Sequence, residues 1–228
     1  MNQQILNPQQ LDAFTEVINI AVGKAAETLS LMIDRQVSIQ TPHIELIAKS
    51  ELMDRFKQRF GAEALGVSIE YSGLMEGVAT LFFEATEGKT LVDQLLAENK
   101  EDDWDDWDDD TDGIDSPSRD HGFTDSDKEA LVEVGNLMIN SLLGSVSNLV
   151  GGQLTYEAPE LNMHFNFIEE FLSLQQGQAF VIESVFREQQ NQVEGLLSIH
   201  FDLGNFLDTF LTKLDHLSGS TSAENDDF

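Results

Sequence analysis

The chain has no cysteine, only four prolines, and only 12 lysine and arginine residues in a total of 228. The missing cysteines exclude a disulfide framework, a thiol nucleophile and a metal site built on thiolates. The few basic residues stand against 42 acidic ones, which gives a formal net charge of −30. This charge argues against nucleic acids and anionic membranes as ligands, because phosphate groups are bound by lysine and arginine.

Long apolar runs are also missing. No stretch of about 18 consecutive apolar residues occurs, which is the length that a membrane-spanning helix needs. The first ten residues, MNQQILNPQQ, carry neither the basic segment nor the apolar run of a signal peptide. We therefore expect a soluble cytoplasmic protein. Its length suits one large domain, or two closely joined halves, with a substantial core.

The acidity is concentrated in residues 101–120, which contain 11 acids and one base. Such a block repels itself and buries too little apolar surface to offset the entropy of ordering. We interpret residues 99–123 as an acidic disordered insert and residues 218–228 as a flexible tail. The D-x-D-x-D-G run at 108–113 is similar to the start of a calcium loop. Its twelfth position is Arg119 instead of glutamate, which favours a solvated acidic loop.

The segments on either side of this block resemble each other. An offset of 117 residues aligns Glu16 with Glu133, Asn19 with Asn136, and Pro42 with Pro159. With a slip of one residue, the alignment continues between residues 74–83 and 192–201. Proline is scarce in this chain, so two prolines at one fixed distance from a Glu-x-x-Asn motif indicate a repeat. We interpret residues 1–98 and 124–217 as two copies of one α–β unit within a single compact domain.

Each copy begins with a predicted long helix. Asn7 and Thr124 are suitable N-caps, Pro8 suits the first helical position, and Asp127 completes a capping box with Thr124. The predicted buried faces are Phe14, Ile18, Ala21, Ala25 and Leu29, then Leu131, Met138, Leu142, Val146 and Leu149.

Short β-like runs follow each of the long helices, and a shorter helix closes each copy. The runs are at 37–40, 44–48, 66–72 and 77–84, then at 153–157, 161–165, 179–187 and 195–202. The closing helices are at 90–98 and 206–217. We predict an α+β fold: a duplicated α–β unit with pseudo-twofold symmetry and two long helices packed on antiparallel strands.

A polar stripe lies opposite the apolar face of each long helix. Its members are Asp12, Glu16, Asn19 and Gly23 in the first copy, and Glu129, Glu133, Asn136 and Asn140 in the second. Asparagine is a poor helix former, so its place in mid-helix in both copies needs a reason beyond surface polarity. A carboxylate and a carboxamide one turn apart can dock a cation and hold a water. The alternatives are simple solvation and, for Glu129, a capping box with Ser126.

The pattern Asp/Ser-x3-Glu-x2-Asn-x22-Pro resembles the signature of the CheC/CheX/FliY phosphatases of bacterial chemotaxis. The first copy matches at every position, whereas Glu129 replaces Asp/Ser in the second. The two-copy arrangement resembles CheC more than the single-site relatives. The resemblance covers both halves, but neither the acidic insert nor the tail.

This resemblance implies dephosphorylation of the phosphoaspartate in a CheY-like receiver domain, with Mg²⁺ supplied by the receiver and no cofactor or metal held by the chain. Asn19 and Asn136 would orient the attacking water, while Glu16 and Glu133 would dock on the receiver. The positions that would shape the two sites are Asp12, Pro42, Glu129 and Pro159. The resemblance also implies a CheD-like deamidase as a further partner. Because the first copy matches the pattern fully, we expect Asn19 to account for more of the turnover.

The alternative function is a non-catalytic binding module of the same fold, as in flagellar switch proteins. Such a module would sequester a phosphorylated receiver or scaffold a complex. Asn19 and Asn136 favour the enzyme, because a scaffold does not need an amide that orients water. The five scattered histidines show no metal-binding spacing, and no serine stands in a nucleophile elbow.

Overall fold

The computed structural model describes residues 7–60, 64–98, 122–163, 178–188, 193–202 and 209–212. The helices are α1 (Pro8–Met32), α2 (Lys49–Phe60), α3 (Ala85–Glu98) and α4 (Asp125–Val150). The strands of the amino-terminal half are β1 (Val37–Ile39), β2 (His43–Ala48), β3 (Ala64–Gly73) and β4 (Glu76–Glu84). Those of the other half are β5 (Leu154–Tyr156), β6 (Glu160–Asn162), β7 (Gln178–Glu188) and β8 (Glu194–Asp202). Residues 209–212 are also helical.

Reciprocal capping boxes start both long helices. The side-chain oxygen of Asn7 accepts a hydrogen bond of 2.9 Å from the backbone N–H of Gln10, whose own side chain accepts one from the backbone of Asn7. Thr124 and Asp127 form the same pair of hydrogen bonds at the start of α4. The predicted caps are therefore confirmed. The alternative role of Glu129, as a capping partner of Ser126, is wrong because Thr124 caps the helix.

The described strands form one curled antiparallel sheet. Its order is β1-β7-β8-β4-β3-β5, with β2 also paired to β7 and β6 also paired to β3. This order is symmetric about the central β8–β4 pair: exchanging β1 with β5, β2 with β6, β7 with β3 and β8 with β4 leaves it unchanged. A duplicated unit would produce this symmetry. The duplication itself stays an interpretation of the sequence, whereas the predicted α+β architecture is confirmed.

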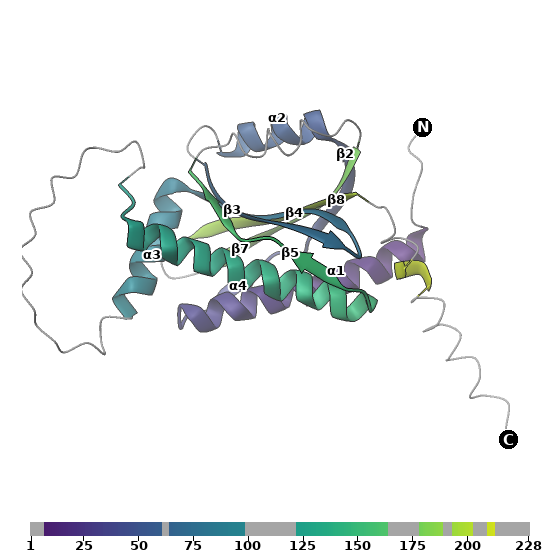
Figure 1. The fold of residues 1–228 in the computed structure, drawn as a ribbon, viewed down its shortest axis with the longest axis horizontal. Coiled ribbons are helices and arrows are strands. Elements are labelled where there is room, and N and C mark those ends of the chain that lie inside the picture. The colour runs from purple at the N-terminus through teal and green to yellow at the C-terminus, as the bar shows by residue number, and fades with distance from the viewer. Residues whose placement is uncertain are drawn as a thin grey trace, which may run out of the picture.

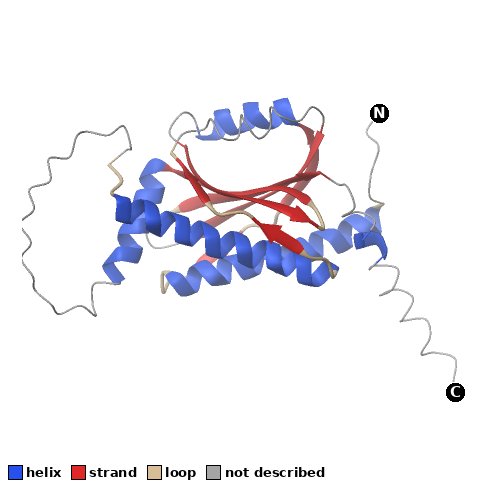
Figure 2. Ribbon diagram, viewed as in Figure 1, coloured by secondary structure: helices blue, strands red, loops and turns tan. Residues whose placement is uncertain are grey.

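Helices cover both faces of the sheet (Figures 1 and 2). On one face, α1 and α4 lie side by side, and the main hydrophobic core is between them and the sheet. On the other face, α2 covers a smaller cluster. Its buried members are Ile47, Leu52, Phe56, Ala64, Phe82, Val181 and Leu196. The two layers leave the outer faces of α1 and α4 exposed.

By length and composition, α4 could cross a membrane, with a mean hydropathy of 1.2 over its most apolar window. Half of that window is buried inside the fold, as expected of a core helix. Its apolar face packs against the sheet and α1, and the hydroxyl of Thr28 in α1 lies 3.0 Å from that of Ser141 in α4. The apolar character of α4 is therefore used by the core.

Most of the predicted elements agree with the structure. Each predicted β-like run overlaps an observed strand, and all the residues of the first predicted buried face are buried. On the second face, Leu149 is the exception, because it is 36% exposed near the end of α4. The helix α2 was not predicted. Its apolar signal is short, since Leu52 and Phe56 are the residues that it contributes to the buried cluster.

An ionic contact also fixes α2 to the sheet. Arg55 pairs with Glu45 of β2 and lies 3.6 Å from Glu183 of β7. The hydrogen bond from Arg55 lowers the pKa of Glu45, whereas burial raises the pKa of Glu183.

Three predictions fall largely outside the described residues: the acidic insert, the calcium-like run at 108–113 and the tail. At the end of the predicted insert, however, Phe123 is only 6% exposed and belongs to the main core. The folded part that includes α4 therefore begins before Thr124. The sequence places Phe123 within the acidic segment because the block that precedes it is acidic, whereas its own side chain packs in the core.

Candidate functional site

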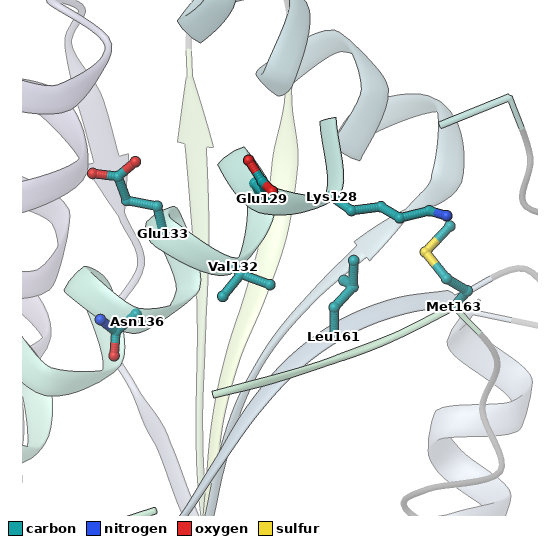
Figure 3. Close-up of a pocket in the computed structure, with 7 residues that line it drawn as sticks. All are labelled: Lys128, Glu129, Val132, Glu133, Asn136, Leu161 and Met163. Carbon is teal, nitrogen blue, oxygen red and sulfur yellow. The ribbon is translucent and has the colours of Figure 1, made fainter. Parts of the chain in front are cut away.

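Three residues of the second polar stripe line an open hollow beside α4. Glu129 and Glu133 are exposed and Asn136 is half-buried. Their i, i+4, i+7 spacing places them on one face of the helix. These three residues border a cavity of about 590 Å³ (Figure 3). The structure therefore brings three of the predicted residues of the second copy together around one concave surface.

Four further residues of this hollow were not predicted: Lys128, Val132, Leu161 and Met163. Val132 comes from α4, whereas Leu161 and Met163 come from β6 and the residue after it. In Figure 3, Lys128 extends toward Met163, at the opposite end of the hollow from Asn136. The hollow thus combines aliphatic and thioether side chains with an acidic rim. The sequence shows Lys128 and Val132 beside the stripe, but it does not show that β6 reaches the same place.

The side chain of Asn136 has a defined hydrogen-bond partner. The Nδ2 of Asn140, one turn further along α4, donates a hydrogen bond of 2.7 Å to the Oδ1 of Asn136. The Oδ1 of Asn140 is itself buried and has no hydrogen-bond partner among the described residues. The Asn136 carboxamide is therefore held at its oxygen, and its N–H groups are not part of this bond.

In the first copy, α1 presents the matching residues in the same way. Asp12 and Glu16 are exposed and Asn19 is half-buried. At the position that matches Asn140, however, this helix has Gly23. A Cβ added to Gly23 would meet nothing within 4 Å. The first copy therefore presents the carboxylate and the carboxamide without the second amide.

An exposed aliphatic side chain follows the asparagine in both copies. Ile20 is 49% exposed and Leu137 is 40% exposed, and these residues are 117 positions apart, as are Asn19 and Asn136. Single exposed apolar residues are common on protein surfaces. At matching positions beside two matching polar groups, they give each site an apolar surface that a bound protein could cover. The alignment of the two segments contains this aliphatic pair, but its exposure is seen only in the structure.

The two prolines of the pattern lie outside the hollow. Pro42 is buried directly before β2, and Pro159 is half-buried directly before β6. Proline fixes the backbone where each of these strands begins. Since β6 contributes Leu161 to the hollow, Pro159 can shape the second site through that strand.

The start of α4 is tied to α3 by a buried carboxylate. Asp127 is only 2% exposed, and its carboxylate lies 3.2 Å from the Nζ of Lys89 in α3. Burial acts to raise the pKa of Asp127, but the backbone N–H of Thr124 and the ammonium group of Lys89 outweigh it, so that the pKa is lowered. This contact holds the first turn of α4, next to Lys128 and Glu129.

The side chains of the hollow suit one kind of chemistry. A carboxamide can both donate and accept hydrogen bonds, and carboxylates bind cations, but neither is a strong nucleophile. Among the described residues, no group of three or more histidine, aspartate or glutamate side chains could hold a metal ion. The arrangement can therefore bind a cationic surface and orient a small polar molecule such as water.

Comparisons with known proteins agree with this picture. No family model matches the chain. The chain is 24% identical over 196 residues to the CheY-P phosphatase CheC of Bacillus subtilis, an alignment that covers 83% of the chain and 85% of CheC. It is 22% identical over 158 residues to the flagellar motor switch phosphatase FliY of Bacillus subtilis. That alignment covers 69% of the chain but only 36% of FliY, so the chain spans about a third of this relative.

The crystal structure of FliY from Thermotoga maritima has the same fold. It matches with a TM-score of 0.65 at 20% identity, over 91% of the chain and 98% of that structure. The similarity to CheC extends over most of both sequences. By its sequence, the chain is similar to CheC and FliY of Bacillus subtilis, and it shares the fold of FliY from Thermotoga maritima.

Proposed function

We propose that the chain is a protein phosphatase that hydrolyses the phosphoaspartate of a CheY-like receiver domain, in chemotaxis or related two-component signalling. The observation that carries this proposal is the half-buried carboxamide beside exposed carboxylates, at matching positions on α1 and α4. The name of the relative CheC, a CheY-P phosphatase, supports the same substrate class. A cytoplasmic location fits such a substrate.

The chemistry needs little from the phosphatase. The oxygen of a water attacks phosphorus in line with the aspartyl oxygen, the P–O bond to the aspartate breaks, and the water's proton passes to the released phosphate. In the receiver, Mg²⁺ would neutralise the phosphoryl charge. The Oδ1 of Asn19 or Asn136 accepts a hydrogen bond from the water, and the amide N–H groups can donate to a phosphoryl oxygen. Positioning of this kind lowers the barrier because the water's orientation is fixed before it reacts.

Docking is assigned to the acidic rim. Glu16 and Glu133 are exposed one turn before their asparagines, where each can pair with a lysine of the receiver. Ile20 and Leu137 lie next to the asparagines and offer apolar contact to the same partner. The charge pairs favour encounter and set the register, and the apolar contacts exclude water from the interface.

The test is phosphate release from a panel of phosphorylated receivers mixed with the purified chain, with Asn19→Ala, Asn136→Ala and the double variant. We expect each asparagine substitution to lower the dephosphorylation rate at its own site by about 10²-fold. Each single variant should therefore keep part of the activity, and the double variant should lose it. Asn148→Ala is the matched control, because Asn148 is exposed on α4 beyond the hollow. A double variant as active as the parent would contradict the proposal. Tight receiver binding without hydrolysis by the parent would instead identify a binding module.

A further inference from the structure

We propose that Asn140 is a positioning residue that fixes the orientation of the Asn136 carboxamide, so that the second site is preorganised and the first is not. This inference rests on the proposed phosphatase function. It concerns the hydrogen bond of 2.7 Å from the Nδ2 of Asn140 to the Oδ1 of Asn136. No part of the family pattern includes this position, which is glycine in the first copy.

In the structure, the hydrogen bond is made in one of the two orientations of the Asn136 carboxamide. The oxygen and the NH₂ group of a carboxamide have nearly the same shape, so a rotation of about 180° exchanges its acceptor and its donors. With Asn140 donating to it, the Oδ1 of Asn136 must face Asn140. A carbonyl oxygen has two lone pairs, so one remains to accept a hydrogen bond from the hydrolytic water. The N–H groups then face the other way and can meet a phosphoryl oxygen.

In the rotated orientation, the donors of Asn136 would face the side from which the water presents its own protons. That orientation cannot hold the water for attack. A carboxamide that rotates between the two orientations must therefore adopt the productive one in each turnover. Asn140 removes this ordering step before the receiver arrives. Preorganisation of a polar group costs nothing at the moment of reaction, which is why it raises the rate.

Stability does not explain the presence of Asn140. Asparagine is a poor residue for a helix interior, and the Oδ1 of Asn140 is buried with no hydrogen-bond partner among the described residues. A buried acceptor without a partner is destabilising. The first copy builds the same helix with Gly23 at the matching position, so the fold does not depend on a side chain there.

The two sites are therefore unequal, and the second is the faster one. This reverses the expectation from the sequence pattern, in which the full match around Asn19 favoured the first site. The pattern compares residue types at four positions. It takes no account of the fifth position, where Gly23 and Asn140 differ.

The experiment isolates each site with an asparagine variant of the other. In the Asn19→Ala background, Asn140→Asp and Asn140→Gly are compared with the unchanged residue. Asn140→Asp keeps the size of the side chain but removes its N–H donors. In both variants, we expect kcat for the phosphorylated receiver to fall about two- to tenfold, with KM nearly unchanged. A fall of this size corresponds to the free-energy cost of ordering one side chain. The reciprocal variant is Gly23→Asn in the Asn136→Ala background, for which kcat should rise.

Gly23→Ala is the matched control, because it changes the helix propensity without adding an amide, and kcat should not rise with it. Thermal unfolding of each variant shows that it is folded, and the Gly23→Asn arm reports on the inference even if both Asn140 variants unfold. The inference is wrong if Asn140→Asp leaves kcat unchanged, if only KM changes, or if Gly23→Asn and Gly23→Ala behave alike. Failure of the proposed function is a separate result, seen when Asn19→Ala with Asn136→Ala has the activity of the parent.

Discussion

Gly135 of α4 lies so close to Val67 of β3 that a Cβ at position 135 would come within 2.5 Å of the Cβ of Val67. The helix can approach the sheet at this point only because the residue has no side chain. Asn136 is the next residue, so this contact sets the height of the candidate catalytic amide above the sheet. The first copy has Ile18 at the matching position, buried in the core.

We expect Gly135→Ala to lower the free energy of unfolding by about 1–3 kcal/mol, because the added methyl group overpacks the contact with Val67. For a chain of this size, that corresponds to a fall in Tm of about 2–4 °C for each kcal/mol. The control is Gly144→Ala on the same helix, where a Cβ would meet nothing within 4 Å. That substitution should be neutral or stabilising by up to about 1 kcal/mol, because alanine is the better helix former. If the two substitutions changed the free energy of unfolding equally, the close approach of Gly135 to Val67 would not be the cause of the effect.

Glu133 and Asn136 should fail differently when each is changed to alanine in the Asn19→Ala background. Glu133→Ala removes a charged contact with the receiver. We expect it to raise the Kd for the receiver and also to slow turnover. Asn136→Ala removes an interaction made in the transition state, so turnover should fall while Kd changes little.

The measurements are binding to a receiver that carries a stable phosphate mimic, and a time course of dephosphorylation. Glu51→Ala is the control, since Glu51 is exposed on α2, over the other face of the sheet. This division of roles would be contradicted if Asn136→Ala lost affinity for the receiver and Glu133→Ala did not.

Asp127 should make the stability of the chain depend on pH in the acid range. Its pKa in the folded chain lies below the ordinary value of 3.8, so the folded state binds fewer protons than the unfolded state. The stabilisation is therefore fully present above about pH 4 and is lost as the pH falls through the folded-state pKa. We expect Asp127→Asn to be less stable than the parent in urea unfolding at pH 6, and the difference to shrink at pH 3.

Asp125→Asn is the control for this series, because the side chain of Asp125 is 98% exposed in the same helical turn. Its difference from the parent should be small at both values of pH. If the difference between Asp127→Asn and the parent grew on acidification, the direction of the pKa change would be wrong.

Deleting residues 101–120 is expected to leave the Tm within a few degrees of the parent. The segment carries 11 acids and little apolar surface, so its removal costs little hydrophobic burial. The same deletion should reduce the salt dependence of receiver binding, because long-range charge effects are screened by salt. Differential scanning calorimetry and binding at two ionic strengths measure the two effects. A fall in Tm comparable to the loss of a core element would show that the segment is structural.

Much of the candidate site could be predicted because its geometry is local. A helix places residues three and four positions apart on one face, so Glu133 and Asn136 had to be neighbours once α4 was recognised. The caps at Asn7 and Thr124 and the apolar faces of the long helices are also short-range patterns. The strands were found for the same reason, since their β-branched and aromatic runs are contiguous in the sequence.

The rest of the site was decided by tertiary structure, because it depends on which distant segments meet. Strand pairing of β6 with β3 brings Leu161 to the hollow on α4, and the approach of β3 explains why residue 135 is glycine. Lys89 of α3 reaches Asp127 only because α3 packs beside α4. Asn140 lies between the two cases. Its spacing from Asn136 is local, but its side chain can turn in several directions, and only the packed structure shows that one amide donates to the other.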